Sequence, residues 1–465
     1  MKDLVINSTH GLWKKINNSF SISLTLSSSL FFISIVAAII IFDSTIVKFI
    51  AVGYKQMPTY TNVYAFVTLS IIFVMCITIL MRTVKKSAIR DELYLRRPYN
   101  VVLVCQYSIF SILLVIILEM MVLKNYNIIL LFFDVYISHV LAIIFLCLLV
   151  VKFVSWLASY RNSVVLTFAA SFSAIASTLF LSLFYLTRQF SLHQFGWSIR
   201  PWRIHDSLMS LPGSEAANSV GIPLDILSFI SFVLTWIASV VLLARYRERL
   251  GKKKYWVIVC IPLIYFLFPF EIYITDLFSG LNDSSPVLFG TMEVIVFSAT
   301  KQVGAVLFAL VFLTTSMIIK PPKMRQALAF TGIGTALLFS SLETDSLIYA
   351  VYPPYGLVTV SFMSVGSYLL YIGFITSSKY VSQDIEIRKE FRKSAESQLA
   401  LLRTIGVSQM EQQLKRTFKN VWERSKTFQD DENYEPDEED VKLMVRDILD
   451  EIHKKDINNH TKKQS

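Results

Sequence analysis

The sequence predicts an all-α fold: a polytopic α-helical membrane protein with about ten spans, both termini in the cytoplasm and a short helical C-terminal tail. Of its 465 residues, 54% are hydrophobic and only 17% are charged, whereas a soluble domain has about 25% charged residues. Many apolar runs reach about 20 residues, the length that crosses a hydrocarbon core about 30 Å thick. Lys and Arg fall mainly in alternate connections between these runs.

Ten apolar runs are long enough to be spans, and together they define a transmembrane domain over residues 22–378, preceded by a cytoplasmic N-terminus of residues 1–21. The expected spans are residues 22–42, 63–83, 101–123, 128–151, 163–186, 224–244, 255–275, 292–318, 327–349 and 357–378. The first run lacks a small-residue cleavage pattern, so we expect it to stay in place as a signal anchor.

The charges of the connections predict the orientation. Lys and Arg gather after the even-numbered spans, as in Arg82–Arg97, Arg245–Lys254 and Lys320–Arg325. The connection after the seventh span, Thr275–Pro286, has acidic residues and no basic one. The positive-inside rule therefore places the even-numbered connections and both termini in the cytoplasm, with the cell membrane as the expected location.

Three stretches outside the expected spans are long enough to form separate parts of the protein. Residues 188–223 form the expected extracellular loop. Residues 379–427 carry apolar positions at helical spacing, which predicts cytoplasmic amphipathic helices. Residues 428–465 combine an acidic linker, a short helix and an end that we expect to be disordered.

A lysine stands inside the expected eighth span, residues 292–318, in the apolar stretch Thr291–Leu313. An unpaired charge at the bilayer centre costs at least a few kcal/mol, so Lys301 should have a partner. The eighth and ninth spans form a hairpin about Pro321 and Pro322, and Glu343 is about as far after this turn as Lys301 is before it. We therefore expect Glu343 to pair with Lys301.

Other ionisable residues fall in the same outer half of the expected spans, and Glu119 and Asp134 are nearly level across their own hairpin. The whole predicted polar cluster is Lys301, Glu343, Asp345, Asp134, His139, Glu119, Glu271 and Glu293. A one-sided cluster favours a polar pocket open to the outside. The alternative is that some of these groups lie in interfacial water and that Lys301 and Glu343 only lock two helices together.

Several function classes lack their signatures. No nucleotide-binding loop and no hydrolase or metalloprotease motif occurs, so we expect no enzyme and no cofactor. The four cysteines lie inside apolar runs without a Cys-x-x-Cys pair, and Asp134 and His139 are five residues apart, so we expect no metal site. The basic residues that give the net charge of +10 lie mainly in the loops between apolar runs. This placement predicts the lipid bilayer, and not nucleic acid, as the partner.

One stretch, Tyr352–Ser394, begins YPPYG and continues through the last span into a polar helix containing Ser-Gln-Asp. It resembles a group of uncharacterised archaeal polytopic membrane proteins, in which a Pro-Pro-Tyr-Gly turn precedes the last span and a similar helix follows it. The resemblance covers this stretch alone. It implies an archaeal plasma-membrane setting and no particular activity.

Two hypotheses for function remain open. In the first, the protein is a sensor or scaffold whose outward-facing polar pocket binds a small extracellular ligand or ion, while its tail docks a cytoplasmic protein. In the second, it is a secondary transporter or an ion-conducting protein that uses the intramembrane charges Lys301, Glu343, Asp345 and His139.

Overall fold

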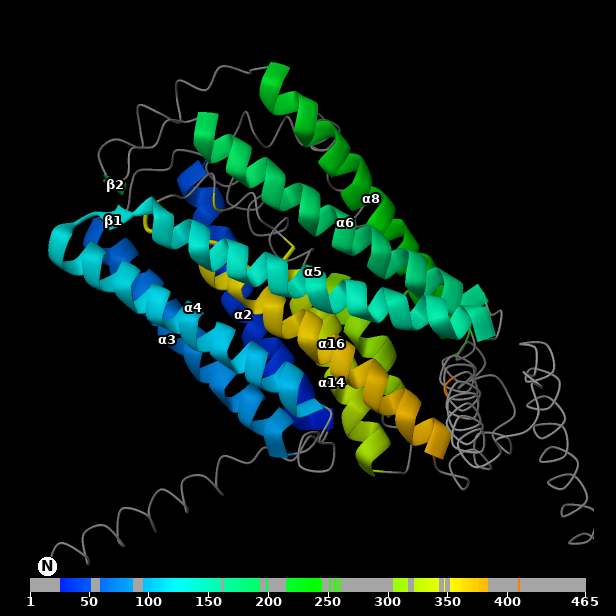
Figure 1. The fold of residues 1–465 in the computed structure, drawn as a ribbon. Coiled ribbons are helices and arrows are strands. Elements are labelled where there is room, and N and C mark those ends of the chain that lie inside the picture. Colours follow the sequence, from blue (N-terminus) through cyan, green and yellow to red (C-terminus); the bar gives the residue numbers. More distant parts are fainter. Residues whose placement is uncertain are drawn as a thin grey trace, which may run out of the picture. The chain divides into compact units, whose positions relative to one another are not determined.

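The computed structural model describes residues 26–51, 59–86, 95–159, 163–192, 198–199, 215–244, 251, 255–256, 259–260, 304–316, 322–342, 347, 352–383 and 409. Within them the chain is built of long helices (Figure 1). These are α2 (Leu26–Ala51), α3 (Thr59–Val84), α4 (Arg96–Leu123), α5 (Ile128–Ser159), α6 (Ser163–Leu192), α8 (Glu215–Ala244), α14 (Pro322–Ser340) and α16 (Leu357–Gln383).

The helices have the length and composition of membrane spans. In the described part of the chain, five of them, α3, α4, α5, α6 and α16, are long and apolar enough to cross a membrane. Three shorter apolar helices cover Phe32–Asp43 in α2, Ile226–Val241 in α8 and Gly304–Ser316. The predicted α-helical membrane fold is thus confirmed at this level, while the count of ten spans and the side of the termini stay predictions.

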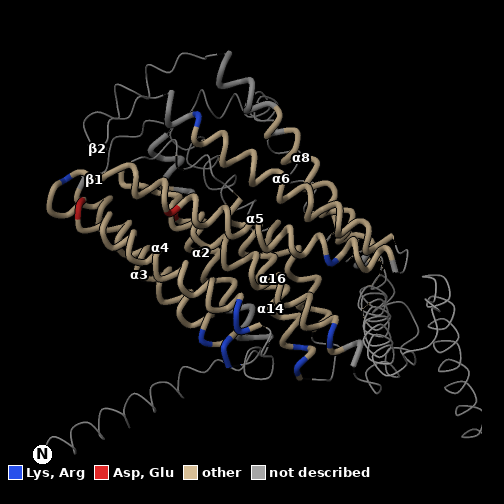
Figure 2. Tube along the Cα trace, viewed as in Figure 1, with Lys and Arg blue, Asp and Glu red and all other residues tan. Residues whose placement is uncertain are grey.

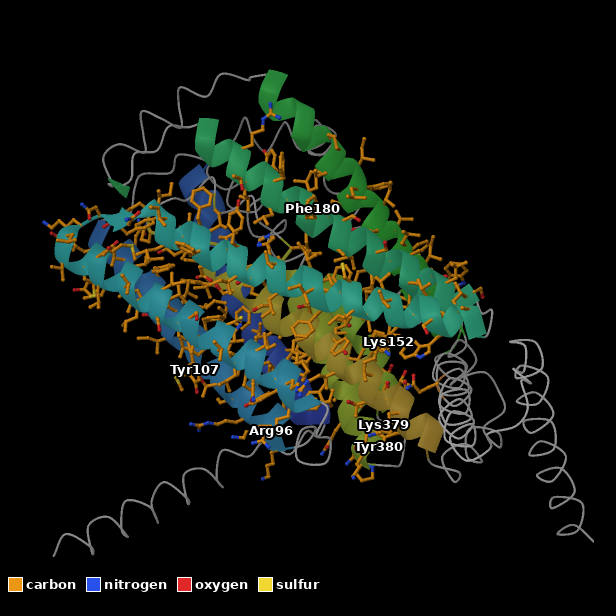
Figure 3. All side chains as sticks on the ribbon, viewed as in Figure 1. Arg96, Tyr107, Lys152, Phe180, Lys379 and Tyr380 are labelled. Carbon is orange, nitrogen blue, oxygen red and sulfur yellow. The ribbon has the colours of Figure 1, made fainter. Side chains whose placement is uncertain are left out.

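Burial within the helices follows the pattern of a protein surrounded by lipid. Only 28% of the apolar window of α4 is buried inside the protein, and its Tyr107 is 60% exposed (Figure 3). On α6, Phe180 is 64% exposed. In contrast, 89% of the corresponding window of α16 is buried, although α16 is the least hydrophobic of the five. The outer helices therefore offer lipid an apolar surface, and the serine-rich α16 is an interior helix.

The chain divides into two compact units. The first consists of Met1–Lys152 and Thr167–Ser377, and the second of Phe153–Leu166 and Ser378–Ser465. In the second unit, the Trp156 indole N–H donates to Gln409 Oε1 at 3.1 Å. The remaining features described below belong to the first unit.

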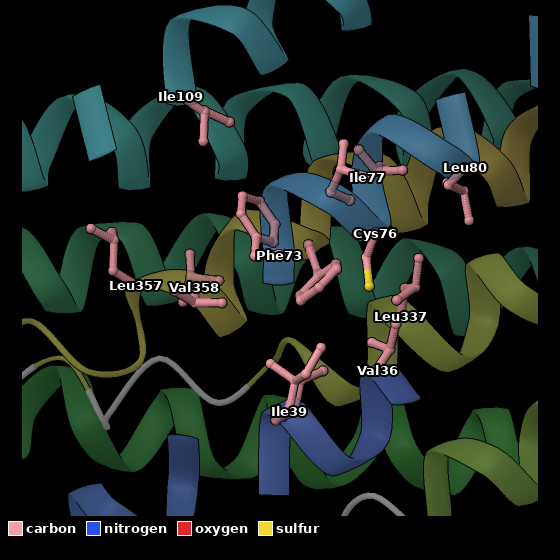
Figure 4. Close-up of a cluster of buried hydrophobic side chains, with 14 of the residues drawn as sticks. Val36, Ile39, Phe73, Cys76, Ile77, Leu80, Ile109, Leu337, Leu357 and Val358 are labelled. Carbon is pink, nitrogen blue, oxygen red and sulfur yellow. The ribbon is translucent and has the colours of Figure 1, made fainter. Parts of the chain in front are cut away.

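The core of the first unit joins α2, α3, α4, α14 and α16 (Figure 4). Phe73 of α3 is at its centre, with edge-to-face contacts to Phe362 of α16 at 4.7 Å and to Phe110 of α4 at 5.9 Å between ring centroids. Val36 and Ile39 of α2 belong to the same cluster. Through these contacts, α2 and α3 from the beginning of the unit pack against α16 from its end.

Glycines let α14 and α16 approach until their backbones touch. A Cβ added at Gly334 would lie 2.5 Å from Leu370 N and 2.7 Å from Gly366 O. A Cβ at Gly366 would in turn lie 2.8 Å from Leu338 N. Close backbone approach through small residues is the usual way in which membrane helices gain packing energy where lipid removes the hydrophobic driving force.

Residues 188–223, predicted as an extracellular loop, contain the end of one long helix and the beginning of the next. Helix α6 continues to Leu192, and α8 already begins at Glu215 with Pro223 inside it. Between them, β2 (Ser198–Ile199) pairs antiparallel with β1 (Tyr126–Asn127), Tyr126 opposite Ile199. The sequence analysis placed the helix start after Pro223, whereas a membrane helix can contain a proline when neighbouring groups satisfy the freed carbonyl.

A group of basic residues lies where α3 ends and where α4 and α14 begin (Figure 2), whereas Lys124 and Arg188 of the first unit lie near the ends of α4 and α6. The group includes Arg82, Arg96, Lys323 and Arg325. This end is the one that the positive-inside rule assigns to the cytoplasm. The first unit thus has one end that is rich in basic residues, and the buried polar groups can be located relative to this end.

The contact between α14 and α16 yields the first prediction. Gly334→Ala forces a Cβ against the backbone of α16, so we expect it to lower the free energy of unfolding by roughly 1–3 kcal/mol, as overpacking does. Gly332→Ala is the matched control, because its Cβ meets the side chain of Leu313 at 2.9 Å, which can move. Denaturation of the purified protein in detergent measures both variants, and equal stability of the two would contradict the close contact.

Candidate functional site: two buried carboxyl groups at the start of helix α16

The start of α16 receives a carboxylate from another helix. Asp43 of α2 is 1% exposed, and its two oxygens accept the Gly356 N–H at 3.1 and 3.0 Å. Its Oδ2 also accepts the Thr359 hydroxyl at 2.5 Å. The first N–H groups of a helix have no partner inside the helix, and the helix dipole favours a negative charge there. Asp43 is therefore well placed as an ionised cap supplied by α2.

The turn before α16 is buried and held on several sides. Gly356 has φ +89°, a conformation that favours glycine, and it ends the segment Tyr352–Gly356. The Tyr355 hydroxyl donates to Asn62 O at 2.7 Å, at the start of α3. The Tyr352 ring stacks on Tyr126, with centroids 6.2 Å apart. The turn thereby fixes the position at which α16 begins.

The tyrosines around this turn keep their protons. Burial raises the pKa of Tyr126 well above its ordinary value, and the neighbouring Tyr352 adds to the effect. Burial also raises the pKa of Tyr355, with the Asp43 carboxylate as the second cause. Because a raised pKa keeps a phenol neutral at physiological pH, the Tyr355 hydroxyl remains a donor to Asn62.

A second buried carboxyl group, that of Asp134 on α5, lies beside α16 one turn beyond the Asp43 contacts. It accepts fewer and weaker hydrogen bonds than Asp43 does. It is 0% exposed. Its oxygens are 3.4 and 3.5 Å from the Ser361 hydroxyl, which also lies 2.7 Å from Leu357 O. A serine hydroxyl has one hydrogen to donate, and the shorter contact to the backbone carbonyl takes it more readily. Asp134 thus has only one weak, contested donor in the described part of the chain.

The two environments favour different chemical states. A carboxylate removed from water is costly unless hydrogen bonds or an opposite charge replace the solvent. Asp43 has a backbone N–H, a hydroxyl and a helix N-terminus, and these stabilise its charge. Asp134 lacks comparable donors, so its neutral, protonated form fits its site better. Asp134 can therefore bind a proton and, when a pathway opens, release it.

Polar groups continue from Asp134 along the same face of α16. The Gln106 amide of α4 donates to Ser364 Oγ at 2.7 Å, and the Ser364 hydroxyl is 3.3 Å from Ser361 O. Gln106 is 2% exposed, and Ser361 and Ser364 are fully buried. Helices α4, α5 and α16 thus share a polar seam inside an otherwise apolar bundle.

His139 is fully buried on α5, as the sequence analysis placed it, inside a span. Its Nδ1 is 2.9 Å from Val135 O, and because a carbonyl only accepts, this nitrogen carries the hydrogen. The other nitrogen, Nε2, has no partner among the described residues. No contact in that part of the chain joins His139 to Asp134.

Glu119, at the end of α4, has a local role. Its carboxylate accepts the Asn127 N–H at 2.8 Å across the turn between α4 and α5. It makes no hydrogen bond to Asp134 in the part of the structure described, although the two were expected at nearly one level. The remaining members of the predicted cluster, Lys301, Glu343, Asp345, Glu271 and Glu293, lie outside the described residues.

The sequence analysis missed Asp43, Gln106, Ser361 and Ser364. Asp43 directly follows the residue at which the first span was expected to end, so it was not counted among the intramembrane charges. The serines of SFMSVGS, at 361, 364 and 367, recur every three residues in the last span. Such a polar stripe in a span indicates a helix face turned toward other helices, and it was the available signal.

No group of three or more His, Cys, Asp or Glu side chains able to hold a metal ion occurs among the described residues. No family model, curated protein or solved structure matches the chain. The resemblance of Tyr352–Ser394 to archaeal membrane proteins therefore stays a prediction.

The contrast between the two carboxyl groups yields the second prediction. Asp43→Asn replaces one acceptor oxygen by an amide and removes the charge, so we expect it to lower the free energy of unfolding by about 2–3 kcal/mol. Asp134→Asn imitates a neutral carboxyl and should lower that free energy by no more than about 1 kcal/mol, the average effect of a single substitution. Denaturation in detergent micelles measures both. Equal losses in the two variants would contradict different charge states for the two groups.

Proposed function

We propose that the protein is a membrane protein that moves protons across the bilayer, with Asp134 taking up and releasing each proton. The observation that carries this proposal is the setting of Asp134, which is 0% exposed and has, in the described part of the chain, a contested hydroxyl at 3.4 Å as its donor. Ionisable residues inside membrane helices commonly mark proton relays and ion paths. The established part of the account is the membrane fold, on which the proposal rests.

The chemistry of Asp134 suits such a cycle. In its neutral form the side chain can stay buried while helices rearrange, because no net charge then has to cross the apolar interior. Loss of the proton leaves a carboxylate with a poor set of donors, which favours a rearrangement that brings water or another donor to it. A carboxyl group as well bound as Asp43 would gain nothing from protonation and serves as a fixed anchor.

A sensor or scaffold is the second candidate, because the Trp156 N–H donates to Gln409 Oε1 at 3.1 Å. This bond ties a residue of the expected cytoplasmic tail to the last turn of α5. A sensor needs such a connection between tail and membrane helix. It needs no proton flux, however, so the experiment below separates the two candidates.

The third prediction concerns proton flux. The purified protein in proteoliposomes, driven by a potassium gradient with valinomycin, should move protons, which an enclosed pH-sensitive dye reports. Asp134→Asn keeps the shape of the side chain but cannot ionise. We therefore expect the flux to fall by at least about 100-fold, the range seen when a proton-transferring group is removed.

Two variants serve as controls. Ser171→Ala changes a buried hydroxyl of α6 that bonds Thr235 of α8 at 2.5 Å, and it should keep the parent flux. Asp134→Glu can still ionise and should retain part of the flux. Flux of Asp134→Asn equal to the parent would overturn the role of Asp134. A folded parent without any flux would overturn the transport proposal and leave the sensor.

A further inference from the structure

Five buried side-chain polar atoms, two of them His139 Nε2 and Thr376 Oγ1, have no hydrogen-bond partner in the part of the chain that the structure describes. The other three lie on α4, α5 and α16. They are Gln106 Oε1, Ser138 Oγ and Tyr368 OH. Gln106 is 2% exposed, and Ser138 and Tyr368 are 0% exposed. More than about 90% of buried polar groups in proteins are bonded to protein or to ordered water, so orphaned atoms of this kind need an explanation.

The register of the helices brings the three atoms to one seam. Asp134 approaches Ser361, and Phe145 packs on Tyr368 with ring centroids 5.2 Å apart, so α5 and α16 run parallel. Ser138 follows Asp134 by one helical turn and therefore faces α16 between these two contacts.

Helix α4 enters the same seam. The Gln106 amide nitrogen bonds Ser364, one turn before Tyr368 on the same face of α16. The Gln106 oxygen sits on the same amide group and so lies in the seam as well. From Ser361 to Tyr368 the helical rise spans about 10 Å.

We infer that this seam binds a short file of water molecules that carries protons to and from Asp134; the inference rests on the proposed function. Its chemistry fits water, since Gln106 Oε1 accepts, while the hydroxyls of Ser138 and Tyr368 both donate and accept. A buried water is held by two to four polar partners, which these three atoms and Ser364 supply. Apolar ligands find no matching surface here.

Proton transfer along such a file conserves protons at each step. A protonated water at the Tyr368 end gives one proton to the next water, which passes one of its own protons onward. The last O–H bond breaks as its proton forms a new O–H bond on the Asp134 carboxylate, leaving a neutral carboxyl group. Gln106 has no transferable proton in this step and only positions water through its carbonyl oxygen.

The fourth prediction tests the file by flux. Gln106→Leu removes the amide, whose nitrogen also bonds Ser364, and Tyr368→Phe removes one hydroxyl. Each should lower proton flux about tenfold, the upper effect of one lost hydrogen bond. Ser367→Ala is the matched control, because its hydroxyl, 0% exposed on α16, bonds Ser364 O within the helix at 2.9 Å. This control should keep the parent flux.

A second measurement detects the water without relying on flux. Brief X-ray radiolysis makes hydroxyl radicals from bound water, and mass spectrometry locates the oxidised side chains. We expect oxidation of Tyr368 and Phe145 in the parent, loss of it in Gln106→Leu, and none at Phe73, which is 0% exposed in the apolar core. Denaturation of each variant, compared with that of the parent, checks that the variant folds.

The outcomes separate the two proposals. Parent flux in both Gln106→Leu and Tyr368→Phe, with Tyr368 unoxidised and Asp134→Asn inactive, would overturn the water file and leave the role of Asp134 intact. A requirement of the flux for Na⁺ would also overturn it, because these oxygens would then hold a metal cation. Oxidised Tyr368 in a parent without flux would support the bound water and overturn only the transport function.

Discussion

The hydrogen bonds from Gly356 and Thr359 to the Asp43 carboxylate are the interaction on which the rest of the first unit depends. They join the start of the last expected span to the first one and satisfy the helix end with a negative charge. With its start fixed, α16 can lie inside the bundle, where its glycines meet α14 and Phe362 meets Phe73. The same placement sets Ser361 beside Asp134 and Ser364 beside Gln106. The stability of the fold and the geometry of the candidate site thus have one origin.

Two aspartates contact the first turns of one helix and yet differ in what they can do. Asp43 is fully bonded, and its charge is part of the structure. Asp134 shares one hydroxyl with a backbone carbonyl, and its neutral form suits its surroundings. The same residue type can take either role, because the hydrogen-bond donors that the fold supplies decide whether the carboxyl group is charged.

The membrane fold could be predicted because long apolar runs and basic connections are local properties of the sequence. Asp134 and His139 could be placed inside a span for the same reason. What the sequence could not reveal was the partner of each polar group, because Asp43 and Thr359 are separated by most of the chain. The search for opposite charges at one level also turned attention to Lys301 and Glu343, whereas the carboxyl groups in the described part of the protein meet hydroxyls and backbone N–H groups. A stripe of serines in a span predicts a functional site less strongly than a charged residue does, because serine occurs in spans for many reasons.

The protonation states of the two carboxyl groups can be measured directly. Infrared difference spectroscopy of protein made with isotope-labelled aspartate separates the C=O stretch of a protonated carboxyl from the bands of carboxylates. The account predicts a protonated aspartate band near neutral pH that Asp134→Asn removes and that Asp43→Asn leaves in place. A protonated band that disappears in Asp43→Asn and persists in Asp134→Asn would contradict it, because the anchor and the proton-binding group would then be exchanged.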